Sequence, residues 1–108
     1  MNIASKASVP TENGAKYTKQ LCKHWAHNLA VEEGEVASTV TFPASGKSGE
    51  WSGEAVLSLE PGPQALECRI EASEPGQLAA LKPVVERHLD RFAFREAPLA
   101  FDWQDEEA

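Results

Sequence analysis

Hydrophobic and polar residues alternate along several short stretches of the chain, which is typical of β-strands that bury one face. The clearest alternation is at residues 66–71, where Leu66, Cys68 and Ile70 are separated by charged residues. Four other stretches show a similar or weaker pattern and lie close to prolines or glycines. The predicted strands cover residues 3–9, 36–42, 51–59, 66–71 and 99–103.

Two segments follow the helical period instead. In the first, Asn13 is a suitable N-cap, and the apolar stripe after it predicts an amphipathic helix of about four turns that reaches Leu29. In the second, Ser73 is the expected cap, Pro83 should kink the helix or divide it in two, and the helix should run on to Glu96. The stripes are Thr18, Leu21, Cys22, Trp25 and Leu29 in the first segment, and Leu78, Leu81, Val85, Leu89 and Phe92 in the second.

The resulting order, β-α-β-β-β-α-β, predicts an α+β fold in which an antiparallel sheet carries both helices on one face. The pair Pro61-Gly62 fits the centre of a type II turn between two of the strands. The predicted core brings Leu21, Cys22 and Trp25 to Cys68, Ile70 and Val85. The predicted uncovered face of the sheet holds Ala37, Thr39, Thr41, Ala55, Leu57 and Leu59.

Length and composition predict one domain over residues 1–108, ordered from about residue 3 to 103, with a frayed acidic tail at 104–108. Seventeen acidic against ten basic residues give a formal net charge of −7, the opposite of a domain that binds nucleic acid through its phosphates. No apolar run approaches the roughly 20 residues that span a membrane, and no secretory signal is recognisable. Two cysteines are too few for a disulfide framework, so we expect reduced thiols and a cytoplasmic protein.

The few basic and imidazole side chains are concentrated in the two helical segments. On the first helix, Lys16, Lys19, Gln20, Lys23, His24 and His27 lie opposite the apolar stripe. On the second, His88, Arg91 and Arg95 are spaced i, i+3, i+7 and can form a cationic patch suited to a carboxylate or a phosphate. The ordinary explanation is a solvated helix face, with cations that interact with the helix C-terminus or pair with Glu96 or Asp102, and it is the favoured one at this stage.

The sequence supports metal binding and catalysis less strongly than it supports anion binding. His24 and His27 could share a metal ion, with His88 as the only further histidine, but Cys22 points about 160° away from His24 on a helical wheel at about 100° per residue. Cys22 also lies on the stripe expected to be buried, where a reactive thiolate is disfavoured. No nucleophile elbow, P-loop or dinucleotide fingerprint is present, so no catalytic residue, metal site or cofactor is assigned.

Three sequence motifs resemble a known family. They are YTKQLCKHWAH at residues 17–27, HLDRFAFRE at residues 88–96 and FDW at residues 101–103. Together they are similar to small bacterial proteins classified as domain of unknown function 2218, and the resemblance extends from about Ala7 to Trp103. It implies bacterial origin and a stand-alone α+β domain, and it supplies no activity, cofactor or catalytic residue.

Similar domains are sometimes attached to flavin-dependent siderophore-interacting reductases, which implies a link to iron handling. The element order also resembles TATA-binding-protein-like domains and the C-terminal domains of phosphohexomutases, but a shared fold implies no shared function.

Three hypotheses follow from the sequence. The leading one is an accessory or binding module, a monomer or weak homodimer, that holds a small anionic ligand or an unidentified protein partner. Its predicted binding residues are Tyr17, Gln20, His24, His27, His88, Arg91 and Arg95. The second is an enzyme or metal-binding domain that uses His24, His27 and His88. The third is a structural domain that pairs through its uncovered, apolar sheet face.

Overall fold

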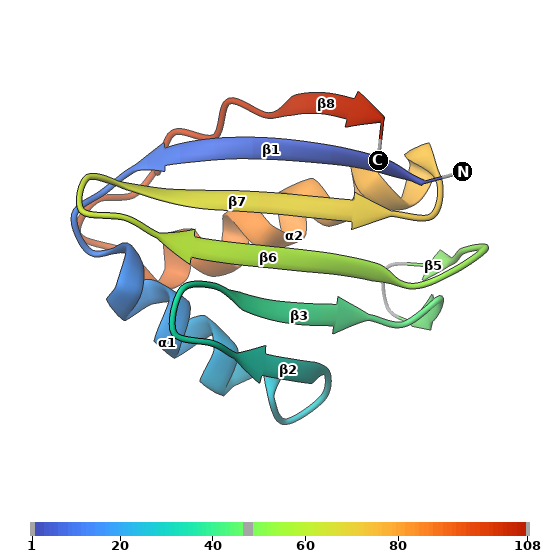
Figure 1. Ribbon diagram of the computed structural model, residues 1–108, viewed down its shortest axis with the longest axis horizontal. Helices are drawn as coiled ribbons and strands as arrows, with labels where there is room; N and C mark the ends of the chain where they lie inside the picture. Colours follow the sequence, from blue (N-terminus) through green and yellow to red (C-terminus); the bar gives the residue numbers. More distant parts are fainter. Residues whose placement is uncertain (1, 47–48, 108) are drawn as a thin grey trace.

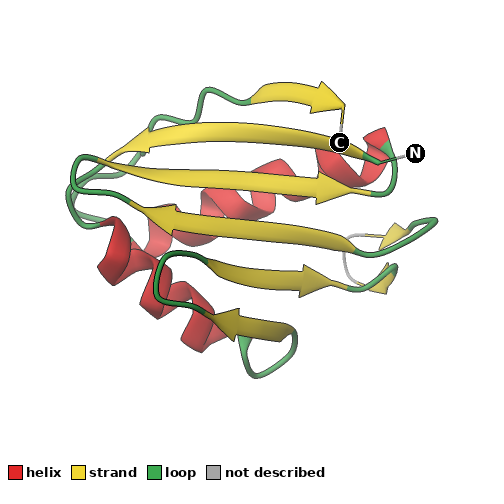
Figure 2. Ribbon diagram, viewed as in Figure 1, coloured by secondary structure: helices red, strands yellow, loops and turns green. Residues whose placement is uncertain are grey.

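The computed structural model describes residues 2–46 and 49–107 and consists of one large antiparallel sheet with two helices on the same face (Figures 1 and 2). The helices are α1 (Gly14–Trp25) and α2 (Pro75–Phe92). The sheet has six strands in the spatial order β2 (Ala30–Glu33), β3 (Ser38–Phe42), β6 (Ala55–Pro61), β7 (Ala65–Ala72), β1 (Ile3–Pro10) and β8 (Gln104–Glu107). A short hairpin, β4 (Ser45–Gly46) with β5 (Gly49–Glu50), lies between β3 and β6 in the chain. The predicted α+β class is confirmed.

The buried face of the sheet is built from rows of residues that the strand register aligns. In the central row Val40 pairs with Leu57, and Leu57 pairs with Ile70, and all three side chains are buried. Residues directly opposite each other in antiparallel strands share a face, so this row defines the side that the helices cover. The expected core is confirmed, because Leu21, Trp25, Cys68, Ile70 and Val85 belong to one apolar cluster and Cys22 is also buried.

This register corrects the predicted uncovered face. Thr39 and Thr41 do lie opposite the helices, but Ala55, Leu57 and Leu59 are fully buried on the helix side. The sequence pattern gave the alternation in β6 correctly but assigned its apolar half to the wrong face. The cause is the irregular connection between β3 and β6, because the number of residues in it cannot be converted into a register without the structure.

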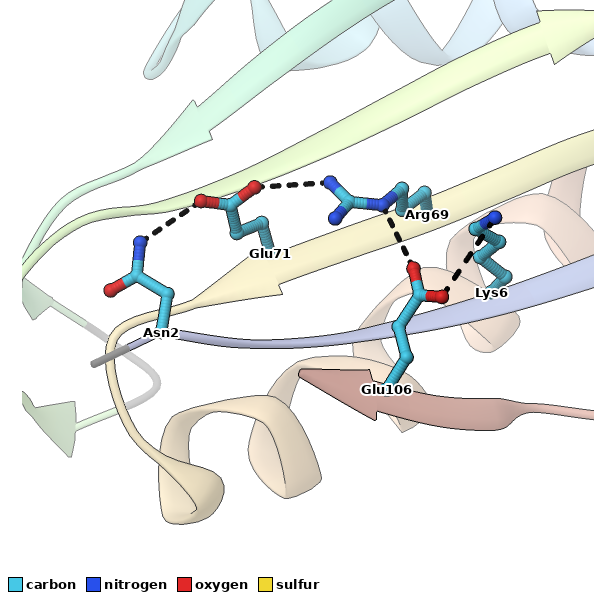
Figure 3. Close-up of polar contacts among 5 residues, drawn as sticks. All are labelled: Asn2, Lys6, Arg69, Glu71 and Glu106. Atoms are coloured by element: carbon cyan, nitrogen blue, oxygen red, sulfur yellow. Dashed lines mark hydrogen bonds and ion pairs between the residues drawn. The ribbon is translucent and has the colours of Figure 1, made fainter. Parts of the chain in front are cut away.

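The uncovered face is polar, which removes the premise of pairing through an apolar sheet. Figure 3 shows its main network, in which the Arg69 guanidinium lies 3.1 Å from Glu71 and 3.3 Å from Glu106. Asn2 donates a hydrogen bond of 2.9 Å to Glu71, and Lys6 lies 3.8 Å from Glu106. By register, the carboxylates on this face are Glu32, Glu60, Glu67, Glu71 and Glu106, against the cations Lys6 and Arg69. This face is therefore acidic.

The two helices differ from the prediction at their ends. Asn13 occupies the N-cap position of α1 but makes no capping bond with its side chain, and Glu74, not Ser73, is the N-cap residue of α2. Helix α1 ends at Trp25, one turn before Leu29, and the backbone N–H groups of Asn28 and Leu29 both bond to the Trp25 carbonyl where the chain turns toward β2.

Helix α2 ends at Phe92 and not at Glu96, since residues 93–96 form a turn. Pro83 does not divide it, because the helix is continuous from Pro75 to Phe92. Proline removes one hydrogen bond to the carbonyl four residues earlier. Here that carbonyl belongs to Ala79, and both residues are exposed, so water can replace the missing donor.

One strand that was not predicted and one predicted turn also need correction. Strand β2 lies outside the predicted strands, yet Val31 pairs with Val40 and is partly buried. The chain between β6 and β7 does not form a type II turn centred on Pro61-Gly62, because β6 extends to Pro61 and, in the described part of the chain, Gly49 alone has a positive φ.

The last strand lies later in the chain than expected. Residues 99–103 are irregular, and the segment expected to be a frayed tail forms strand β8 through Glu107, while Ala108 lies outside the described residues. Three contacts hold this C-terminal segment along one side of α2, where Asp90, Glu86 and Lys82 follow at intervals of four. They are Leu99 N–H to Asp90 at 2.9 Å, Trp103 Nε1 to Glu86 at 2.8 Å and Lys82 Nζ to Asp105 at 2.7 Å.

No described helix combines the length and the apolar character needed to cross a membrane.

Candidate functional site

A cleft of about 490 Å³ opens where the end of α1, the middle of α2 and the end of β3 meet. Both helices lie on the same side of the sheet, which brings these segments together although they are far apart in sequence (Figure 1). Four histidine, asparagine and arginine residues line the cleft, namely His24, Asn28, Arg87 and His88. Its other lining residues are Trp25, Leu29, Phe42, Pro43, Gly46, Leu81 and Val84.

Aromatic and imidazole rings pack against one another in the cleft wall. The ring centroid of His88 lies 4.9 Å from that of Trp25 and 5.5 Å from that of His24. Trp25 also meets Phe42 edge to face at 5.2 Å. These contacts fix the orientation of the two imidazoles, because each ring is held by its neighbours as well as by the helix that carries it.

Several polar groups of the cleft have no partner in the part of the chain that the structure describes. His88 Nδ1 lies 2.7 Å from the carbonyl oxygen of Val84, and because a carbonyl only accepts, Nδ1 carries the proton. Within residues 2–46 and 49–107, no hydrogen bond is made by His88 Nε2, by the side chains of His24 and Asn28, or by the indole N–H of Trp25, and Arg87 has no ion pair. These groups remain available to a ligand.

The electrostatics of the cleft combine a permanent cation with a neutral imidazole. Arg87 is exposed, and its guanidinium supplies the cation. Burial lowers the pKa of His24 below the ordinary value for histidine, and the neighbouring His88, Arg91 and His27 lower it further. His24 is therefore neutral at pH 7, and it can donate or accept a hydrogen bond.

The seven residues predicted as a binding site do not form one surface. His24 and His88 line the cleft, whereas Tyr17 and Arg95 line a second, smaller hollow of about 270 Å³ together with Lys16, Phe92 and Phe94. Gln20, His27 and Arg91 are partly or fully exposed and line neither hollow. In the described part of the chain, neither Arg91 nor Arg95 forms an ion pair with Glu96 or Asp102.

Arg95 departs from the predicted spacing because α2 ends before it. The positions of His88, Arg91 and Arg95 would fall on one side of a helix only if the helix continued to Glu96. The chain instead turns after Phe92, and Arg95 places its guanidinium 5.7 Å from the ring of the exposed Phe94.

Tyr17 has a structural contact that the sequence did not reveal. Its side chain is buried, and its hydroxyl donates to the carboxylate of Glu96, which also accepts hydrogen bonds from Thr11 at 2.8 Å and Asn13 at 3.1 Å. The hydrogen bond from Tyr17 is the largest cause that lowers the pKa of Glu96, followed by those from Asn13 and Thr11. Tyr17 thus ties the start of α1 to the turn after α2.

We expect the variant Tyr17→Phe to lower the free energy of unfolding at pH 7 by about 1 kcal/mol, the usual net value of one hydrogen bond. The folded-state pKa of Glu96 is depressed, so its contribution is complete above the ordinary value of about 4.3 and is lost as pH falls through the folded-state value. Urea unfolding at pH 7 and pH 3 should therefore show a smaller difference between variant and wild type at pH 3. An undiminished difference at pH 3 would contradict this account.

The described residues provide no third ligand for a metal ion bound by the histidines. The structure shows no group of three or more histidine, cysteine, aspartate or glutamate side chains arranged to hold a metal ion among the residues it describes. His27 lies beyond the end of α1 and is exposed, so the i, i+3 spacing with His24 is not a helical one. The two thiols are unpaired and buried. Burial raises the pKa of Cys68 to about 12, and burial is also the largest cause that raises the pKa of Cys22 above its ordinary value.

Sequence reasoning missed most of the cleft. Arg87 adjoins His88 in the sequence but was not singled out, because it is offset from the i, i+3, i+7 set. Trp25 was assigned to the core, and it is buried, but it also lines the cleft. Phe42 and Pro43 end a strand that the sequence pattern could not place next to α2. The one usable signal was the concentration of cations and imidazoles on two helices that share a sheet face.

Comparisons with known proteins agree with this fold and assign no activity. The family described as "Uncharacterized protein conserved in bacteria (DUF2218)" matches residues 6–104. The NMR structure of PA4090 from Pseudomonas aeruginosa is similar with a TM-score of 0.72 and 27% sequence identity, over 94% of this chain and 95% of that chain. No curated protein matches this chain. The resemblance inferred from the three sequence motifs is thus confirmed.

Proposed function

The chain belongs to this family of uncharacterised bacterial proteins, and we propose that it is an accessory module that binds an anionic ligand in the cleft between α1 and α2. One observation carries the proposal. Among the residues that the structure describes, the cleft is lined by Arg87, His24 and His88 and by no carboxylate, in a chain that has 17 acidic and ten basic residues. Unpartnered donors without a neighbouring acid favour an anion.

The distribution of charge over the molecule supports the same site. Helix α1 contains Lys16, Lys19 and Lys23 and no acidic residue, whereas the uncovered face of the sheet is acidic. The acidic side of the protein repels an anion and the helical side attracts it, so a negative ligand approaches the helices despite the net charge of −7.

The wider setting is part of the proposal. The association of similar domains with siderophore-interacting reductases makes a siderophore complex one of the anions to test. The buried, unpaired thiols of Cys22 and Cys68 suit a cytoplasmic protein. The proposal assigns no catalytic step.

Titration of ¹⁵N-labelled protein tests the site directly. The ligands are inorganic phosphate, citrate and the gallium(III) complex of an anionic catecholate siderophore, which replaces the paramagnetic ferric complex. Amide shifts should move at His24, Asn28, Arg87 and His88 with at least one of them. Shifts that are confined to other segments, or are absent with all three anions, would refute the proposal.

We expect Arg87→Gln to weaken binding of the anion by roughly tenfold or more, since a hydrogen bond to a charged group contributes on that scale. The matched control is Arg95→Gln, which removes the same charge outside the cleft and should change the dissociation constant by less than about twofold because solvent screens it. Isothermal titration calorimetry at about 0.15 M salt measures both variants. If Arg95→Gln had the larger effect, the binding site would lie at the turn after α2 instead.

A further inference from the structure

The cleft offers more apolar surface than an inorganic anion can use. Leu29, Phe42, Pro43, Leu81 and Val84 line it alongside the polar groups. A phosphate or citrate ion is hydrated on every side, so it would leave these side chains against trapped water and gain nothing from them. A ligand that covers them would add hydrophobic free energy to the electrostatic attraction.

The size of the cleft points the same way. Its volume of about 490 Å³ is within the range of about 300–1,000 Å³ that is usual for sites that bind small organic molecules. Such sites are mostly apolar and contain a few polar groups that orient the ligand, which is the composition found here.

The number of positive charges limits the ligand's own charge. Among residues 2–46 and 49–107, Arg87 is the one permanent cation in the lining, and His24 is neutral at pH 7. A single guanidinium presents two parallel N–H donors, which match the two oxygens of a carboxylate. Asn28, which also lines the cleft, can donate a further hydrogen bond through its side-chain amide.

We infer that the ligand of this cleft is an organic monocarboxylate with an apolar, ring-sized body, which binds its carboxylate at Arg87 and Asn28 and its body against Val84 and the neighbouring apolar side chains. This inference rests on the proposed function, because it names the class of anion that the same site takes. The inference assigns the charge of the ligand to Arg87 and its body to the apolar lining residues, and a substitution can change either group of residues alone.

Three probes test the inference by calorimetry and by ¹⁵N spectra. They are 2-naphthoate, which has both parts, 2-naphthylmethanol, which has the body without the charge, and inorganic phosphate, which has the charge without the body. Naphthoate should bind roughly tenfold or more tightly than either of the others, with shifts at His24, Trp25 and His88. The variant Arg87→Gln should weaken naphthoate and leave naphthylmethanol unchanged.

A second variant changes the apolar part. Val84 is partly buried on α2, and Val84→Thr replaces a methyl group by a hydroxyl of similar size. It should weaken naphthoate severalfold and leave phosphate unaffected, because the hydroxyl makes the apolar wall polar. The ¹⁵N spectrum of each variant verifies that it is folded.

The outcomes separate this inference from the proposed function. Phosphate that binds in the cleft as tightly as naphthoate would overturn the ligand class and leave anion binding intact. Naphthylmethanol that binds as tightly as naphthoate would overturn both, since charge would then play no part. Naphthoate that binds outside the cleft, or not at all, would overturn the ligand class.

Discussion

Leu57→Ala should lower the free energy of unfolding by about 3–4 kcal/mol, which is within the range found when leucine is truncated in a packed core. Leu57 is fully buried at the centre of the sheet, between Val40 and Ile70, and its side chain belongs to the cluster that the helices cover. Truncation removes apolar contacts and leaves a cavity that strands on both sides prevent from collapsing. Urea denaturation monitored by circular dichroism measures the change.

The matched control is Val56→Ala, one residue earlier on the opposite face of β6. Val56 is only partly buried and lies on the polar, uncovered side, so its truncation should cost about 1 kcal/mol or less. The pair tests which half of this strand faces the helices. If Val56→Ala lowered the free energy of unfolding more than Leu57→Ala, the sequence-based assignment of the uncovered face would be right and the observed register would be wrong.

Gln77→Leu is expected to destabilise the protein by about 3 kcal/mol, although it puts an apolar residue of similar size at a buried position. Gln77 is fully buried, and its Oε1 accepts hydrogen bonds of 2.7 Å from both the N–H and the hydroxyl of Ser73. Its Nε2 donates to the carbonyl of Gly53 at 2.9 Å. Leucine would leave the Ser73 N–H without a partner and remove one donor from Gly53, and unmet buried groups cost about 1–3 kcal/mol each.

Gln20→Leu provides the comparison for this substitution. Gln20 is exposed on α1 and makes no hydrogen bond with the described part of the chain, so the change should stay within about 0.5 kcal/mol. Thermal or urea unfolding of both variants measures the two changes in stability. Equal stabilities for the two variants would show that the Ser73–Gln77–Gly53 network contributes nothing.

Gln77 also illustrates a limit of sequence analysis. In the sequence, Gln77 stands next to Leu78 near the start of α2 and looks like an ordinary polar residue of a helix. The hydrophobic period of the helix does not distinguish a buried glutamine from an exposed one. Burial follows from the connection at Gly53, which lies 24 residues earlier and reaches Gln77 only through the tertiary fold. The same network explains why Ser73 is not the expected helix cap. Its hydroxyl lies within hydrogen-bond distance of Gln77 and of the Gly53 carbonyl instead.

The candidate site was predictable only in part for a similar reason. His24 and His88 were identified because imidazoles are rare in this chain and stand out on helical faces. Arg87 and the apolar wall gain their role from the crossing of α1 over the sheet beside α2 and from the end of β3, which are contacts between distant segments. The contact of Tyr17 with Glu96 is of the same kind, because it joins segments that are distant in the sequence.

The sequence by itself determined the class of fold, the apolar stripes of both helices and the alternation within β3, β6 and β7, because these depend on the local period of side chains along one segment. Only the tertiary structure decided which face of β6 is buried, that Glu-rich β2 and acidic β8 form edge strands, and that α2 ends at Phe92. Those features depend on backbone pairing and on charges such as Lys82 and Arg69, which meet Asp105 and Glu106 only after the chain has folded. The cleft belongs to this second group, since two helices and a strand must come together before its cation, its imidazoles and its apolar wall face one another.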